Sequence, residues 1–152
     1  MIVEGAHTFT ARPETVWPLL LDPGVIGRAM PGARELVETA PGRYQGRLLV
    51  TVGPITAAEF ALQIAIDNQE PPRRFDMTVD ANGKFGFTRG IANVSLLPEG
   101  DATRMEYRAE LQVGGKIASV GQRLLDMVSR TMLRSGLEAL GKEVRRRLES
   151  GS

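Results

Sequence analysis

Three side chains at positions predicted to face the core carry groups able to act as an acid, a base or a hydrogen-bond donor. His7 shares strand parity with the apolar Val3 and Phe9, where an imidazole could serve as a general base or hold a ligand carbonyl. Tyr44 and Tyr107 could each direct a hydroxyl into a cavity. Each of the three could instead have a structural role, in which its imidazole or hydroxyl group forms a hydrogen bond to the backbone. No second titratable residue at the inward positions of the neighbouring strands forms a pair with His7, so the pattern favours polar anchors or structural roles over a catalytic centre.

The composition excludes several classes of chemistry. The 152 residues include no Cys and one His, which excludes thiol catalysis, thiolate metal sites and multi-histidine metal sites. Nineteen Lys and Arg against eighteen Asp and Glu leave a formal charge of +1, without the basic excess typical of nucleic-acid-binding proteins. We therefore expect neither a bound metal nor a nucleic-acid partner.

The chain length and hydropathy predict one soluble, intracellular domain over residues 1–149. No stretch approaches the roughly 20 apolar residues that a membrane-spanning helix requires. The first residues lack the basic and apolar regions of a signal peptide. The final Ser150–Ser152 has the composition of a cloning remnant or marks the point at which a natural tail is truncated.

The hydrophobic periodicity predicts an α+β fold. Alternation with a period of two predicts a strand over 2–11, and a Pro followed by Glu opens a short helix over 13–21, with a second short helix over 23–30. The period returns to two over 34–113, where Pro- and Gly-rich turns separate six strands. It then becomes 3.6 over 116–148, which predicts one helix of about thirty residues. We expect a seven-stranded curved antiparallel sheet around this long C-terminal helix, with the two short helices after the first strand.

A sheet wrapped around one helix leaves space between them where small residues alternate with large ones. Gly46, Ala92 and Ala109 occupy inward strand positions, and Gly121 and Gly136 interrupt the helix. Close helix–sheet packing and room for a ligand are both consistent with this pattern. If a ligand binds, the lining residues predicted on the helices are Trp17, Ile26, Met30, Val120, Leu124, Met127, Val128 and Met132. Those predicted on or next to the strands are Phe60, Phe75, Met77, Phe87 and Tyr107.

Turn alternation in a meander places the segments 53–56, 81–86 and 113–116 at the same end of the sheet. This end is rich in glycine and combines apolar with basic side chains, as expected of a mouth that meets a membrane surface or another protein. Ordinary loops tucked onto the core are the alternative. The residues predicted to form this docking rim are Lys84, Phe85, Lys116 and Arg123.

Several short segments, in this order and spacing, resemble the G-subunit family of carbon monoxide dehydrogenase, within the polyketide cyclase, START and birch-pollen-allergen-like superfamily. They cover nearly the whole chain and include Val16-Trp17, Met30-Pro31-Gly32, Val52-Gly53-Pro54, Pro71-Pro72 and Val113-Gly114-Gly115-Lys116. The sequence departs from the family in the last helix, where Met132-Leu133 and Leu137 stand in place of paired phenylalanines.

The resemblance implies a helix-grip fold with a deep apolar cavity and a non-catalytic accessory role beside a carbon monoxide dehydrogenase of the molybdenum hydroxylase type. It further implies a lipid-like ligand such as menaquinone or ubiquinone, no covalent cofactor, and a position at the inner face of the cytoplasmic membrane. Two alternatives stay open: an assembly or membrane-recruitment factor with no functional ligand, and an enzyme of the cyclase or hydrolase type.

Overall fold

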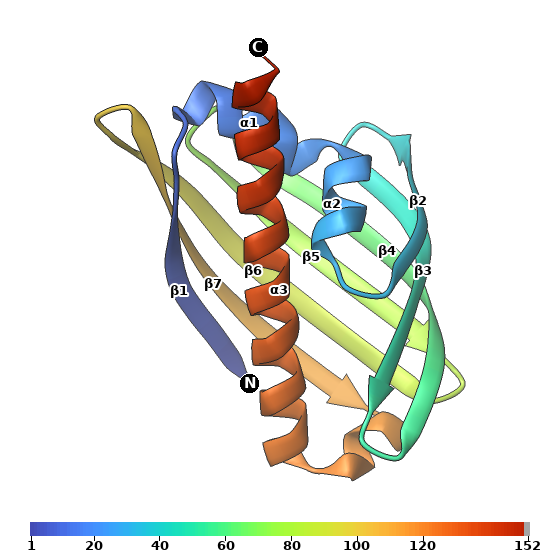
Figure 1. Cartoon of the computed structure of the whole chain (residues 1–152). Coiled ribbons are helices and arrows are strands. Elements are labelled where there is room, and N and C mark those ends of the chain that lie inside the picture. Colours follow the sequence, from blue (N-terminus) through green and yellow to red (C-terminus); the bar gives the residue numbers. More distant parts are fainter. Residues whose placement is uncertain (151–152) are drawn as a thin grey trace.

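The computed structural model in Figure 1 shows a seven-stranded antiparallel sheet that curves around one long helix, α3. It describes residues 1–150, so residues 151 and 152 of the suggested remnant lie outside the described part. The strand order is β1-β7-β6-β5-β4-β3-β2. In chain order the elements are β1 (Ile2–Phe9), α1 (Pro13–Leu21), α2 (Pro23–Ala29), β2 (Ala33–Ala40), β3 (Arg43–Val52), β4 (Ile55–Glu70), β5 (Arg74–Gly83), β6 (Gly86–Glu99), β7 (Ala102–Gly114), the short 3-10 helix η1 (Lys116–Val120) and α3 (Gln122–Glu149). The predicted α+β architecture is confirmed.

The concave face of the sheet is apolar because the strands alternate as their sequences predict. On β4, Phe60, Leu62 and Ile64 are buried, whereas the intervening Ala61 and Gln63 are exposed. The register places Leu62 opposite Ala81 of β5, which is also buried. This face packs toward α3 and forms the wall of the site described below.

Helices α1 and α2 close one end of the sheet. The Asp22 carboxylate caps α2 by accepting hydrogen bonds from the backbone N–H groups of Gly24, at 2.8 Å, and Val25, at 3.2 Å. Helix α2 is then joined to α3, because Arg28 Nε donates to the largely buried Glu143 carboxylate at 2.5 Å. This contact holds α2 against the C-terminal half of α3.

The C-terminal segment is two helices rather than the single helix predicted over 116–148. Gly121, at a φ of 100°, ends η1 and precedes the first residue of α3. A φ in this region is accessible to glycine and costly for other residues. The periodicity of 3.6 continues across this break, so hydrophobic spacing alone did not reveal it.

Gly136 lets α2 approach α3 closely, and we expect Gly136→Ala to destabilise the protein by about 1–3 kcal/mol. A Cβ at this position would lie 2.5 Å from the backbone carbonyl oxygen of Ala29. Gly27→Ala, on α2, is the matched control, since its Cβ would meet only Leu36 at 3.8 Å. Urea unfolding of both variants measures the difference. A Gly136→Ala variant as stable as Gly27→Ala would contradict this close packing.

Candidate functional site

Two apolar chambers lie between the concave face of the sheet and α3. The η1 chamber, of about 230 Å³, lies toward the glycine-rich end, and the α2 chamber, of about 260 Å³, lies beneath α1 and α2. Met30 and Met132 line both chambers. Methionine side chains are flexible and unbranched, so these two can change rotamer and let one long ligand extend through both spaces.

The lining of the chambers carries no charged side chain. The polar groups on it are the hydroxyls of Thr88 and Ser129 in the η1 chamber and of Tyr107 in the α2 chamber. An apolar lining with a few polar groups suits a hydrophobic ligand held by dispersion and oriented by one or two hydrogen bonds. Acid–base chemistry on a substrate would require a positioned titratable pair, which these linings do not supply.

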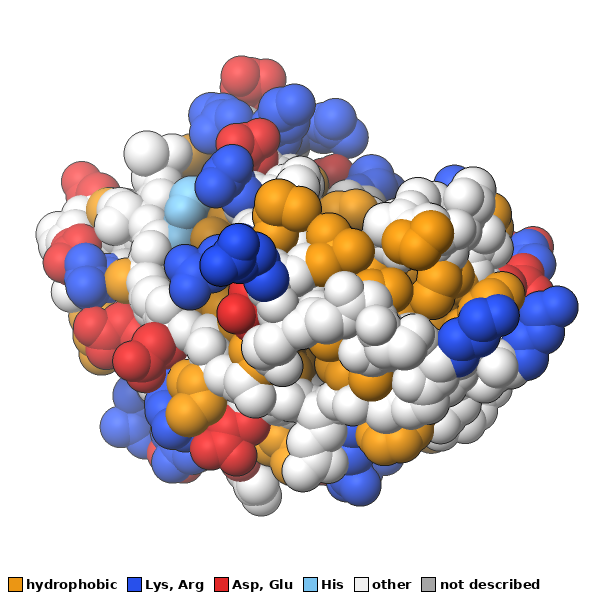
Figure 2. All heavy atoms as spheres, turned by 90° about the horizontal axis from the view of Figure 1, so that it is seen from below, with side chains coloured by type: hydrophobic (Ala, Val, Ile, Leu, Met, Phe, Trp, Pro, Cys, Tyr) orange, Lys and Arg blue, Asp and Glu red, His pale blue; other side chains and the backbone are white. Residues whose placement is uncertain are grey.

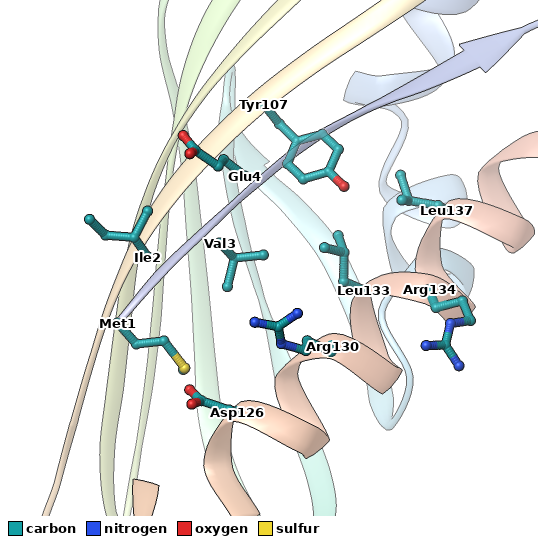
Figure 3. A pocket seen from close by; sticks show the side chains of 10 residues that line it. All are labelled: Met1, Ile2, Val3, Glu4, Tyr107, Asp126, Arg130, Leu133, Arg134 and Leu137. Atoms are coloured by element: carbon teal, nitrogen blue, oxygen red, sulfur yellow. The ribbon is translucent and has the colours of Figure 1, made fainter. Parts of the chain in front are cut away.

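Each chamber meets an open groove at one side of α3. The β1 groove, of about 430 Å³, lies between β1 and α3 (Figure 3) and shares Val3, Tyr107, Leu133 and Leu137 with the α2 chamber. The β3 groove, of about 390 Å³, lies between α3 and the segment around Gly32 and β3, and shares Val50, Val128 and Met132 with the η1 chamber. Each chamber therefore lies directly behind one of the two grooves, with shared side chains at the junction.

Most of the predicted cavity residues line these chambers. They are Ile26, Met30, Phe60, Phe75, Met77, Tyr107, Val128 and Met132. Their positions follow from strand parity on β4, β5 and β7 and from one face of α3.

Five predicted cavity residues lie elsewhere. Phe87 is on the outer face of the sheet with 42% of its surface exposed, because Thr88, its neighbour on β6, is the residue that lines the η1 chamber. Met127 is 58% exposed and lines the β3 groove. Trp17 lies behind the chamber wall, edge-on to Phe75 with ring centroids 5.5 Å apart. Val120 and Leu124 pack against the core outside both linings, with Leu124 covering Gly53.

Of the three predicted polar anchors, Tyr107 alone lines a chamber. The Tyr44 hydroxyl is buried and donates to the Leu21 carbonyl oxygen at 2.5 Å, and burial raises its pKa to about 12. The His7 ring packs against Phe9, with ring centroids 4.8 Å apart, and desolvation lowers the pKa of the imidazole. Tyr44 therefore has a structural role, with its hydroxyl bonded to backbone. His7 lies outside both chambers.

Three of the four predicted rim residues come together at the glycine-rich end. The Lys84 and Lys116 ammonium groups each lie 5.5 Å from the centre of the Phe85 ring, a cation–π distance. Arg123 is exposed at the start of α3, and within residues 1–150 no hydrogen bond, ion pair or ring contact joins it to this group. Seen from below, Figure 2 shows hydrophobic side chains gathered on the surface with Lys and Arg side chains on both sides of them.

Sequence reasoning missed the β1 groove, which is lined on α3 by Asp126, Arg130, Leu133 and Arg134. Their spacing of three and four residues places them along one side of the helix, which is the signal that could have grouped them. These four residues include both charged and apolar side chains, so hydrophobic periodicity does not identify them as one face of the helix.

One family model matches most of the chain. The CoxG family, described as the G subunit of carbon monoxide dehydrogenase, matches residues 5–145. No curated protein matches the sequence. None of the helices formed by residues 1–150 has the length and hydropathy required to cross a membrane.

Solved structures share the fold at low sequence identity. A conserved protein from Geobacillus kaustophilus is 23% identical with a TM-score of 0.88, and the alignment covers 96% of each chain. A protein from Chromobacterium violaceum is 15% identical with a TM-score of 0.72, covering 94% of this chain and 96% of that one. A START superfamily protein from Mycobacterium smegmatis is 16% identical with a TM-score of 0.69, covering 95% and 97%. These likenesses establish the START-type fold.

Proposed function

Since the chain belongs to the CoxG family of carbon monoxide dehydrogenase, we propose that it carries an isoprenoid quinone in its two chambers and presents it to such a dehydrogenase. The protein takes no part in bond making in this role. The dehydrogenase supplies the electrons, and this chain supplies a soluble environment for an insoluble acceptor.

The observation that carries the proposal is the uncharged lining of two adjoining chambers that meet at Met30 and Met132. Each CH₂ group of an isoprenoid tail favours an apolar environment by about 0.8 kcal/mol, so a long-tailed quinone stays in the bilayer unless a protein offers comparable burial. Chambers lined by aliphatic and aromatic side chains offset this cost. The same lining provides no acid–base pair for a cyclase or hydrolase.

The proposed role also requires contact with the membrane and with the dehydrogenase. The group formed by Lys84, Phe85 and Lys116 is suited to this contact, because two cations lie close to one apolar ring. Anionic lipid headgroups or an acidic protein surface complement such a group. We place the protein peripherally at the inner face of the cytoplasmic membrane.

Fluorescence of Trp17 tests the ligand class. Trp17 is the one tryptophan of the chain, and it contacts Phe75, which lines the α2 chamber. Quinones quench tryptophan emission, so a titration should give saturable quenching whose affinity increases about threefold or more with each added isoprene unit, as the buried apolar area grows. Affinity that does not change with tail length would contradict the proposal.

Reversing the rim charges should weaken docking without changing ligand binding. We expect Lys84→Glu with Lys116→Glu to lower binding to anionic vesicles about tenfold or more at low salt, with the difference shrinking as salt screens the charges. Vesicle co-sedimentation measures docking, and Trp17 quenching measures quinone binding. Arg145→Glu with Arg147→Glu, two exposed positions on α3, is the control that changes the net charge by the same amount. If the double variant docks as well as the wild type, the protein contacts the membrane through a surface other than this rim.

A further inference from the structure

The β1 groove differs chemically from the chambers behind it. Its lining includes Glu4 on β1 and Asp126, Arg130 and Arg134 on α3, whereas the chambers carry no charge. Val3, Tyr107, Leu133 and Leu137 line both the groove and the α2 chamber. A molecule with its tail in the chamber can therefore extend a polar end into the groove.

Two hydrogen-bond donors face this junction without a partner of their own. Figure 3 shows the Tyr107 hydroxyl pointing from β7 toward α3, and the Arg130 guanidinium pointing from α3 toward Val3 and Met1. Within residues 1–150 the Tyr107 hydroxyl makes no hydrogen bond and Arg130 makes no ion pair. Gly5 preserves the space beside the hydroxyl, since a Cβ there would lie 2.7 Å from the hydroxyl oxygen.

The two carboxylates of the groove already have partners nearby. Glu4 pairs with Arg108 at 3.6 Å, and Asp126 accepts a hydrogen bond from Gln122 at 2.9 Å. Arg130 and Arg134 line the same groove, so its two carboxylates and two guanidinium groups leave no net charge that calls for an anionic head. A neutral head with carbonyl oxygens fits this balance of charges, because it can accept hydrogen bonds from Tyr107 and Arg130.

We propose that the β1 groove is the head-group site, where Arg130 and Tyr107 donate hydrogen bonds to the ring oxygens of a neutral quinone whose tail lies in the α2 chamber. This inference rests on the proposed function. The reduced quinol fits the same site, because its hydroxyls can donate to the Asp126 carboxylate. The ring thus lies in an open groove where an electron donor can approach, and the tail stays buried.

Two variants test the head-group site, with a short-chain menaquinone and the matching isoprenoid hydrocarbon as probes. We expect Arg130→Met and Tyr107→Phe each to weaken menaquinone binding about tenfold, the effect of losing one good hydrogen bond. Hydrocarbon binding should change less than about twofold, because the tail contacts remain. Arg147→Met, exposed on the same helix, is the matched control, and melting temperatures verify that each variant folds.

The outcomes separate the head-group site from the proposed function. Menaquinone binding that is unchanged in both variants would overturn the site while leaving the carrier role intact. Wild-type protein that binds the hydrocarbon as tightly as menaquinone would likewise overturn the site alone, whereas wild-type protein that binds neither probe would overturn the carrier role. If oleate binds more tightly than menaquinone, and its binding depends on Arg130, the groove holds an anionic head. That result would overturn the proposal of a neutral head.

Discussion

Val128→Trp should lower the affinity for a long-tailed quinone at least about a hundredfold while the protein stays folded. Val128 lies on α3 and lines both the η1 chamber and the β3 groove. An indole at this position would occupy the η1 chamber, whose volume is about 230 Å³, and the removal of several buried methylene contacts accounts for the loss. Since the chamber is space rather than packed core, the substitution should cost little stability.

Met127→Trp is the matched control for this substitution. Met127 precedes Val128 on the same helix, and it is 58% exposed and lines only the outer groove. We expect this variant to bind the quinone within about threefold of wild type, because its ring can remain in solvent. A Val128→Trp variant that melts like wild type and still binds the quinone fully would show that the ligand lies outside the η1 chamber.

Electron transfer from the dehydrogenase to a long-tailed quinone should depend on this protein in a membrane-free assay. We expect its addition to raise the rate of quinone reduction more than about tenfold, because the tail otherwise keeps the quinone in aggregates or in lipid. A short-tailed, soluble analogue should respond less than about twofold. Anaerobic assays with carbon monoxide as the electron donor measure both rates.

The Val128→Trp protein is the internal control for that assay, since it keeps the docking rim and loses the ligand. Equal reduction of both quinones without this protein would contradict the carrier role. That result would favour the alternative in which the protein is an assembly or membrane-recruitment factor with no functional ligand.

The fold was predictable because each strand keeps one apolar and one polar face. The alternation of Met105, Tyr107 and Ala109 with charged residues identified β7 and its inward side, and the periodicity of 3.6 identified α3. The break at Gly121 was not predictable, because the apolar spacing continues across it while the backbone turns.

The chambers were predictable in position but not in shape. Strand parity brought Phe60, Met77 and Tyr107 to the same face, as expected. Phe87 was assigned to the cavity as an apolar residue at the glycine-rich end, although the residue with inward parity on β6 is Thr88. The grooves depend on how far α3 lies from β1 and β3, a distance that no periodicity encodes, and this is why Arg130 was missed.

The central claim is that the chambers hold an isoprenoid quinone, and organic extraction of protein purified from its own host tests it most directly. Native mass spectrometry before extraction, and mass spectrometry of the extract afterwards, give the ligand and its stoichiometry. We expect about one isoprenoid quinone per chain, and much less in Val128→Trp protein prepared in the same way. Chains that are empty, or that carry a polar ligand unaffected by that substitution, would contradict it.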